Sequence, residues 1–348
     1  MGKIRIQSVT RDNILKMHPY SSARDEFQGN ASVLLDANEN PFNNPYNRYP
    51  DPHQRELKGQ ISAITGMSVD SIFLGNGSDE AIDLLIRAFC EPGKSNVISI
   101  DPSYGMYEVC AQVNNVEFRK VSLDNDFSLN PEALLNASDA ESRIIFLCSP
   151  NNPTSNLLEY SSMLKVVNGF NGLVVIDEAY IDFASFKGML KDIDENNNLV
   201  ILRTFSKAWG MAAIRLGMAF ADKEIISILD KIKYPYNISL LTQDIMSKRL
   251  SASDYTKDWV SMIISQRDKL AKQLAQFGFI LRVFPSDANF LLVRFVNARE
   301  VYNFLRDNGI IVRDRSRVNL CDECLRITVG SEDENSKLLQ ILKQYKPL

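Results

Sequence analysis

The chain has 348 residues, of which 45% are hydrophobic and 24% charged, and its formal net charge is −4. These values are ordinary for a globular protein, and the length suits one large domain with a smaller one. The weak acidic charge argues against nucleic-acid binding, which favours clustered positive charge. No apolar run approaches the roughly 20 residues that cross a bilayer. The N-terminus also lacks the apolar stretch of a signal peptide, so we expect a cytoplasmic protein that binds no membrane.

Cysteine and histidine spacing predicts neither a metal site nor a disulfide framework. Cys321 and Cys324 form a single Cys-x-x-Cys, and the only histidines are His18 and His53. A structural zinc ion needs four ligands, which this spacing does not supply. Five cysteines, an odd number in a long chain, do not indicate a disulfide-stapled fold.

The chain divides into three predicted parts. Residues 1–44 carry little periodicity, and we expect them to form an N-terminal arm and part of the smaller domain. Residues 45–252 alternate apolar β-branched runs with helical patterns, which predicts a large α/β domain whose mostly parallel sheet is covered on both faces. Residues 253–348 mix helical patterns with short strands, which predicts a smaller α+β domain.

Strands and helices can be expected at specific positions. The large domain should contain strands at 96–100, 144–148, 173–176, 200–202 and 216–220. A helix is expected over 78–90, because an anionic first turn suits the positive end of a helix. The smaller domain should contain helices at 259–277 and 298–308, and strands at 290–295, 310–313 and 324–329. Ligands of such α/β sheets bind at the carboxyl ends of the strands, which directs attention to the residues that follow them.

The segment after the strand at 200–202 is the most informative part of the chain. It places Thr204, Ser206, Lys207 and Arg215 within twelve positions. A lysine amine can bond to an aldehyde, while hydroxyls and a guanidinium can hold a phosphate. The combination predicts a site for a phosphorylated aldehyde such as pyridoxal phosphate (PLP), and therefore a PLP enzyme.

Two turns are further candidates, although each has a simpler interpretation. The segment 75–80 is glycine-rich and opens a helix, so its amides could face an anion, or it could be only a turn. The segment 149–154 contains two prolines and two asparagines after a strand, and Asn152 could point its amide inward. A stiff turn without any ligand explains that segment about equally well.

Two charged residues sit where burial is expected. Asp177 follows a buried run directly, and an isolated buried carboxylate is costly, so it must be paired. A pyridinium N–H is a suitable partner, and Tyr180 could then reach the 3′-oxygen of the ring. The alternative for Asp177 is a helix cap. Arg326 lies inside an apolar strand, where it could bind a carboxylate or phosphate, or form an internal salt bridge.

Taken in chain order, these segments resemble the fold type I PLP-dependent aminotransferases over essentially the whole chain. Further local matches make the chain most similar to the histidinol-phosphate aminotransferase subfamily, at 36–41, 47–50, 75–80, 102–107 and 324–330. The resemblance implies an α/β fold with a mostly parallel seven-stranded sheet between helices, plus a smaller α+β domain. It also implies a homodimer that transaminates L-histidinol phosphate with 2-oxoglutarate, giving imidazole acetol phosphate and L-glutamate in histidine biosynthesis.

The resemblance implies a cofactor role for each matching residue. Lys207 would bond to PLP and, when released, carry the proton between the substrate Cα and C4′. Asp177 would pair with the pyridine nitrogen, while Asn152 and Tyr180 would hold the 3′-oxygen. Tyr104 would stack on the ring. The cofactor phosphate would be held by a glycine loop, two hydroxyls and an arginine, namely Gly77, Ser78, Asp79, Thr204, Ser206 and Arg215.

The resemblance also implies residues that act on the substrate or across subunits. Tyr49 would reach the cofactor phosphate from the second subunit. Arg313 and Arg326 would bind the substrate phosphate or the glutamate carboxylate, and Tyr20 and Asn38 would complete the substrate site. One position departs from the family's Asn-Pro-Thr-Gly turn, because Ser155 stands in place of glycine. Serine tolerates positive φ less well than glycine, so the resemblance carries over to Asn152 and not to the backbone of this turn.

Other functions remain open from the sequence. Two arginines suit an aromatic or broad-specificity aminotransferase equally, and a phosphothreonine decarboxylase also joins PLP to a phosphorylated substrate. A PLP-binding regulator without catalysis would need an added basic helix-turn-helix, for which no segment is available. A nucleotide-binding sugar enzyme would leave Lys207, Asp177 and Arg215 unexplained.

Overall fold

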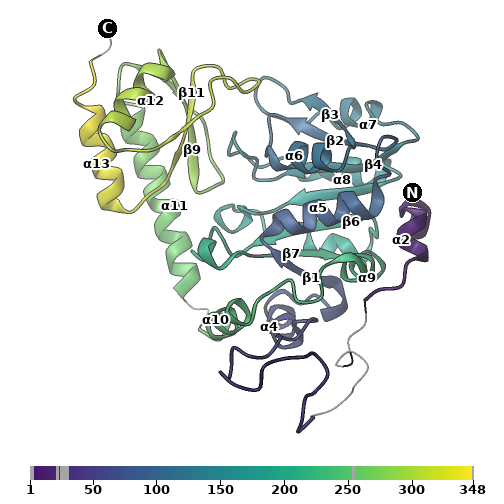
Figure 1. Ribbon diagram of the computed structural model, residues 1–348. Coiled ribbons are helices and arrows are strands. Elements are labelled where there is room, and N and C mark those ends of the chain that lie inside the picture. The colour runs from purple at the N-terminus through teal and green to yellow at the C-terminus, as the bar shows by residue number, and fades with distance from the viewer. Residues whose placement is uncertain (1–3, 21–22, 24–30, 253–254, 347–348) are drawn as a thin grey trace.

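Two sheets, built from separate stretches of the chain, organise the structure (Figure 1). The computed structural model describes residues 4–20, 23, 31–252 and 255–346. The larger sheet has seven strands in the order β1-β7-β6-β5-β4-β2-β3. Its strands are β1 (Ile72–Asn76), β2 (Asn96–Asp101), β3 (Glu117–Ser122), β4 (Ser142–Cys148), β5 (Leu173–Asp177), β6 (Leu199–Thr204) and β7 (Leu216–Ala221).

The five neighbouring strands β3, β2, β4, β5 and β6 pair with one another in parallel. Strand β7 runs antiparallel to both of its neighbours, β1 and β6. Strand β4 shows why the strand sequences are continuously apolar. Ile144 and Phe146 pack into a core on one face, while Ile145 and Leu147 pack into a core on the other. Both faces are therefore buried, as expected for a sheet covered by helices on each side.

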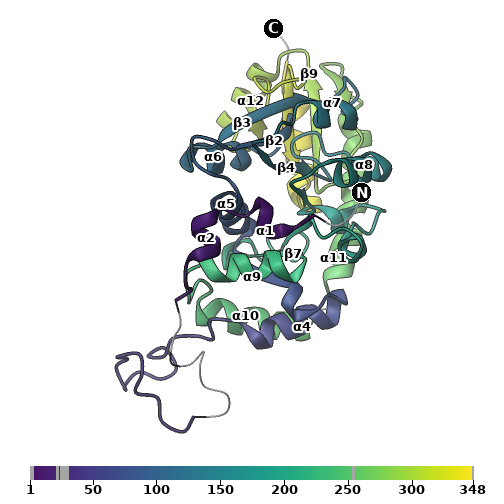
Figure 2. The same cartoon turned by 90° about the vertical axis from the view of Figure 1, so that its right-hand side faces the viewer.

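Two sets of helices cover the two faces. The first core receives side chains from α1 (Ile6–Val9), α5 (Ser78–Phe89), α6 (Met106–Val113) and α9 (Lys223–Ile232). The opposite core receives side chains from α4 (Arg55–Thr65), α7 (Pro131–Asn136), α8 (Tyr160–Gly169) and α10 (Leu240–Ser251). The two views in Figures 1 and 2 show the sheet between these helices.

The smaller sheet is antiparallel, in the order β10-β11-β9-β8. Its strands are β8 (Ile280–Val283), β9 (Phe290–Phe295), β10 (Arg313–Asp314) and β11 (Cys324–Thr328). It shares a core with α11 (Tyr255–Leu274), α12 (Ala298–Asp307) and α13 (Glu332–Leu342). The predicted fold class, a large mostly parallel sheet between helices with a smaller α+β part, is confirmed.

Several elements differ from the sequence-based expectation. Strands β1, β3 and β8 were not among the expected strands, and β10 is only the pair Arg313–Asp314 instead of 310–313. Strand β3 lies at the sheet edge and is charged and half-exposed, so it lacks the apolar signal of an inner strand. The described part of residues 1–44 includes the helices α1 and α2 (Asp12–Lys16), but four and five residues are too few for a detectable period.

Candidate active site

The carboxyl ends of β4, β5 and β6 lie side by side and open onto one cavity, of about 160 Å³. The start of α5 and the loop before β7 complete its wall. All of the residues that were predicted to contact the cofactor within one subunit line this cavity. The lining comprises Gly77, Ser78, Asp79, Tyr104, Cys148, Asn152, Asp177, Ala179, Tyr180, Thr204, Ser206, Lys207, Ala212 and Arg215.

One end of the cavity has the features of an anion site. Helix α5 begins there, after Gly77 with φ of 73°, so that its first amides are free of intrahelical partners. A Cβ at Gly77 would lie 2.7 Å from Nη2 of Arg215, and a Cβ at Gly217 would collide with the amide nitrogen of Ser78. Arg215 itself has φ of 57°, a left-handed conformation that is unusual for arginine. The backbone therefore packs too closely around Arg215 and Ser78 to accept a side chain at Gly77 or Gly217, and the left-handed backbone of Arg215 is strained.

Two hydroxyls lie beside this helix start. Thr204 donates a hydrogen bond to Oγ of Ser206 at 3.0 Å, and the Ser206 amide donates to Oγ1 of Thr204 at 3.1 Å. The pair is therefore fixed in position at the end of β6. With the guanidinium of Arg215, 3.8 Å from the Asp79 carboxylate, these groups suit a phosphate.

Asp177 is the last residue of β5 and is only 3% exposed. Tyr107 donates a hydrogen bond to Oδ2 at 2.9 Å, and the Ala179 amide donates to Oδ1 at 3.0 Å. Burial raises the pKa of Asp177 to about 6, because these hydrogen bonds offset only part of the desolvation. No described cation forms an ion pair with Asp177. Its carboxylate is therefore available to bind a cationic N–H group of a ligand in the cavity.

Tyr107 was missed by the sequence analysis. It lies in α6, is completely buried and stacks on Phe146 at 4.6 Å between ring centroids. It was part of the matched segment 102–107, but nothing in that segment indicates that its hydroxyl reaches a carboxylate 70 positions later. Cys148, Ala179 and Ala212 also line the cavity without having been predicted.

Lys207 lies half-buried in the cavity with no hydrogen bond or ion pair to any of the described residues. Its ammonium nitrogen is 5.6 Å from the centroid of the Tyr180 ring. Burial, and then the positive charge of Arg326, lower the pKa of Lys207 from its ordinary range. A lysine in this state is more readily neutral, which makes its amine a better nucleophile and base.

The smaller sheet borders the cavity through Asn152 and Tyr180. Nη1 of Arg326, on β11, donates a hydrogen bond to Oδ1 of Asn152 at 2.5 Å. Phe290, on β9, meets the Tyr180 ring edge-on at 5.1 Å. Arg326 forms no ion pair with any described carboxylate. Within the described part of the chain, an internal salt bridge therefore does not explain why an arginine occupies this strand.

Arg326 also lines a second cavity, of about 370 Å³, together with Arg313, its register partner on β10. The two arginines assigned to the substrate anion therefore lie on neighbouring strands. Tyr104 lines the first cavity, and its hydroxyl donates to Oδ1 of Asp79 at 3.1 Å.

Three predicted residues lie outside these cavities of the same chain. Tyr20 is 70% exposed, Asn38 is exposed, and Tyr49 is 51% exposed with its ring stacked 4.5 Å from that of Tyr236. Asn38 and Tyr49 belong to the irregular segment 31–54, which precedes α4 and runs below α4 and α10 in both ribbon views (Figures 1 and 2).

The turn with Ser155 keeps a left-handed backbone. Ser155 has φ of 69°, and its amide donates to the Asn151 carbonyl at 2.7 Å. Its hydroxyl also donates to the carbonyl of Pro285 at 3.2 Å, in the loop before β9. Serine therefore adopts the conformation that glycine usually supplies, and it ties the turn to the smaller sheet.

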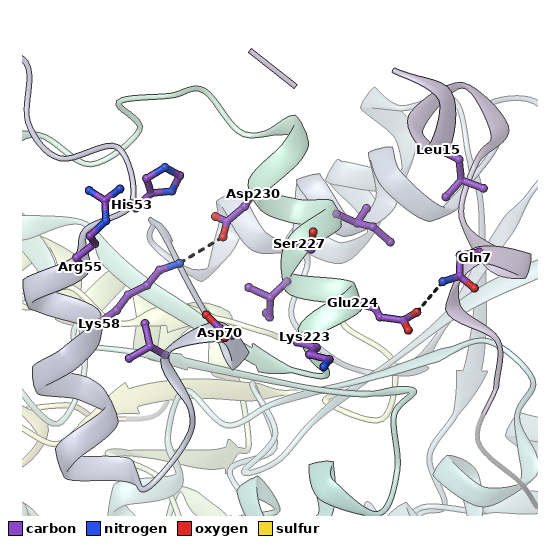
Figure 3. A pocket seen from close by; sticks show the side chains of 13 residues that line it. Gln7, Leu15, His53, Arg55, Lys58, Asp70, Lys223, Glu224, Ser227 and Asp230 are labelled. Carbon is purple, nitrogen blue, oxygen red and sulfur yellow. Dashed lines mark hydrogen bonds and ion pairs between the residues drawn. The ribbon is translucent and has the colours of Figure 1, made fainter. Parts of the chain in front are cut away.

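A larger cavity, of about 870 Å³, lies elsewhere, between α4, α9 and the N-terminal helices (Figure 3). Two polar contacts join residues of its wall. Lys58 forms an ion pair with Asp230 at 3.4 Å, and the Gln7 amide donates a hydrogen bond to Glu224 at 3.0 Å. It contains none of the predicted site residues. In the described ranges, no helix is long and apolar enough to span a bilayer.

Comparison with known proteins agrees with this geometry. The family described as aminotransferase class I and II matches residues 27–342. The chain is 54% identical to a protein named histidinol-phosphate aminotransferase from Parabacteroides distasonis, over 98% of this chain and 99% of that one. The solved structure of a histidinol-phosphate aminotransferase from Clostridium acetobutylicum gives a TM-score of 0.79 at 27% identity, over 86% of this chain and 90% of that chain. Another, from Sinorhizobium meliloti in complex with pyridoxal-5′-phosphate, gives 0.78 at 23% identity, over 85% and 83%, and shares the fold.

Proposed function

Because the chain belongs to the class I and II aminotransferase family, we propose that it transfers the amino group of L-histidinol phosphate to 2-oxoglutarate, using PLP. The products are imidazole acetol phosphate and L-glutamate, in a step of histidine biosynthesis. One observation carries the proposal: a single cavity joins the free amine of Lys207, the buried carboxylate of Asp177 and an anion cradle. Arg326 borders that cavity without an ionic partner among the described residues.

The residues present fit PLP group by group. The amides at the start of α5 and the Arg215 side chain would hold the phosphate, together with the hydroxyls of Thr204 and Ser206. The carboxylate of Asp177 would face the pyridine nitrogen. When bound, PLP takes up the electron pair released as the substrate Cα–H bond breaks. The side chains that would surround the ring are those of Tyr104, Asn152 and Tyr180.

Lys207 would move the proton. Its lowered pKa favours a neutral amine, which can accept the proton from the substrate Cα and return it at C4′. Asp177 would remain ionised beside a cationic ring nitrogen, because an opposite charge favours the charged form. A base that takes and returns one proton favours amino transfer over loss of carbon dioxide.

Arg313 and Arg326 would bind the substrate anion, with Tyr20 and Asn38 completing the substrate site. In the purified protein, the visible absorbance of the cofactor should disappear on borohydride treatment, which tests for PLP. Substrate selectivity can then be tested by comparing amino donors. We expect kcat/KM for L-histidinol phosphate to exceed those for phenylalanine and tyrosine by at least about 10-fold, since charge-assisted hydrogen bonds to phosphate contribute about 1.5–3 kcal/mol. Equal values would instead indicate a broad aromatic aminotransferase. Carbon dioxide release from phosphothreonine would indicate a decarboxylase.

A homodimer is part of the proposal. Large apolar side chains are exposed in the segment before α4, in the loop before α10 and on α10, namely Val33, Leu35, Phe42, Tyr46, Tyr234, Leu241 and Ile245. Such a surface is typical of a protein interface. Tyr49, which lies outside the cavity of its own chain, would then contact the cofactor phosphate of the second subunit.

If the active sites are shared between subunits, two variants that are each inactive should regain activity in mixed dimers. Mixed dimers of Lys207→Ala and Tyr49→Ala contain one site with both native residues and one with neither. Refolding the two variants together should give about a quarter of wild-type activity, because random pairing makes half of the dimers mixed and each holds one intact site. Activity at limiting PLP should be compared with that of each variant refolded alone. No recovery in confirmed mixed dimers would place Tyr49 outside the partner's site.

A cytoplasmic location is also proposed. All five cysteines are free, and all are buried. Free thiols are typical of proteins in a reducing compartment.

A further inference from the structure

Arg315 lies between β10 and β11, beside the two arginines already assigned to the substrate anion. Its backbone is fixed, because its amide donates to the Cys324 carbonyl at 2.9 Å. Its side chain is half-buried, and the Nε atom is buried without a hydrogen-bond partner among the described residues. No described carboxylate forms an ion pair with its guanidinium. A buried donor without a partner is costly, so this arrangement needs an explanation.

The surroundings of Arg315 make the cost larger. Burial, and then the positive charges of Arg326 and Arg313, lower the pKa of Arg315 to about 10. It also interacts electrostatically with Tyr180, which lines the PLP cavity. Three guanidinium groups therefore lie within electrostatic range of one another, and one of them, Arg326, bonds to Asn152 in the wall of that cavity. Like charges in a partly buried cluster repel, and they persist when a ligand of opposite charge is to be bound.

The nearest acidic residue in the sequence does not neutralise the cluster. The carboxylate of Asp314 forms an ion pair with Arg299 at 3.0 Å. Its Oδ1 atom also accepts hydrogen bonds from the amide of Ser316 at 2.9 Å and from the Ser316 hydroxyl at 2.5 Å. Its carboxylate is thus fully engaged, and the three arginines are left for a ligand.

We propose that Arg315 is a third guanidinium of the substrate anion site and that it favours a phosphate dianion over a carboxylate. The inference rests on the proposed function. A phosphate monoester carries a charge of about −1.5 to −2 and three acceptor oxygens, whereas a carboxylate carries one charge and two oxygens. Arg313 and Arg326 suffice for the carboxylate of glutamate, while a third guanidinium finds a partner only on the phosphate.

The test replaces Arg315 by glutamine and follows each amino donor in a single-turnover half-reaction. Removing one charge-assisted hydrogen bond should lower the second-order rate constant for L-histidinol phosphate by about 10- to 100-fold, with less than about a 3-fold change for L-glutamate. Arg317→Gln is the matched control, because Arg317 is exposed on the same loop. It should change both rate constants by less than about 2-fold. Equal losses with both donors, or no loss, would overturn the proposal.

Thermal stability gives a second, independent measurement on the PLP-loaded protein. Without a substrate anion, Arg315→Gln should leave the Tm unchanged or raise it, because an unpaired buried cation is removed. Inorganic phosphate should raise the Tm of the wild type more than that of Arg315→Gln, and acetate should not separate them. A lowered Tm with an unchanged phosphate effect would assign Arg315 a purely structural role. If the wild type fails to use L-histidinol phosphate, the proposed function fails, whereas the phosphate measurement still decides the role of Arg315.

Discussion

Replacing Lys207 by alanine should leave a folded protein whose transaminase turnover is reduced by about 10⁴-fold, the upper end of the range for one group that transfers a proton. Lys207 is the only lysine among the residues that line the PLP cavity in the described part of the chain. Its amine has no hydrogen bond or ion pair to lose among the described residues, and its contact with the Tyr180 ring, at 5.6 Å from the centroid, is weak. The fold should therefore survive.

The measurement is a coupled assay with L-histidinol phosphate and 2-oxoglutarate, together with circular dichroism and gel filtration. Borohydride should fix the cofactor to the wild-type peptide that contains residue 207, and not to the variant. A small primary amine in the buffer should restore part of the lost rate, because it can act as a base in the vacated volume. Lys165→Ala, which removes an exposed lysine on α8, is the control and should behave as the wild type. Wild-type turnover in Lys207→Ala would refute the assignment.

The sequence indicates Lys207, Asp177 and Asn152 for a common physical reason. Each lies at the end of a buried apolar strand or a few residues after it, and the carboxyl ends of adjacent parallel strands meet at one edge of a sheet. A polar or charged residue at that point is costly unless it has a partner, so its presence is informative. The outline of the large sheet follows from the same apolar runs.

Residues whose role depends on distant contacts could not be predicted in this way. Tyr107 reaches Asp177 only because the fold brings the start of α6 near the end of β5, and in the sequence it is one more aromatic residue in an amphipathic helix. Arg315 is one of several charged residues in its segment, and its lack of a partner becomes visible only when β10 and β11 are paired. Strand β3 was not predicted because it lies at the edge of the sheet, pairs only with β2 and is largely exposed, so its sequence is not apolar. These contacts are set by tertiary packing, which local periodicity does not encode.

Replacing Asp177 by asparagine should lower turnover by at least about 100-fold, the scale for losing one preorganised electrostatic partner. Asparagine has nearly the same shape, and its carbonyl oxygen can still accept one of the two hydrogen bonds, from Tyr107 or from the Ala179 amide. It cannot carry the negative charge that would hold a proton on the cofactor ring nitrogen. An effect within a few-fold would reduce Asp177 to a residue that caps the turn at Ala179.

The same substitution should stabilise the cofactor-free protein. The pKa of Asp177 is raised from 3.8 to about 6 by burial, so the folded state binds this proton more tightly than the unfolded state does. Its carboxylate therefore has no destabilising effect below pH 4 and reaches its full effect above pH 6, on the order of 3 kcal/mol for a shift of about two pKa units. Stability of the cofactor-free wild type should fall as the pH rises through this window.

Urea unfolding of the cofactor-free proteins between pH 4 and pH 8 measures this difference. Asp177→Asn should be more stable than the wild type at pH 7.5, and the two curves should converge towards pH 4. Asp258→Asn, an exposed position on α11, is the control and should follow the wild type throughout. An Asp177 variant that is less stable at every pH would show that the carboxylate supports the fold. A variant that is more stable yet inactive would show that the fold tolerates a buried charge at the end of β5 because a bound cationic partner uses it.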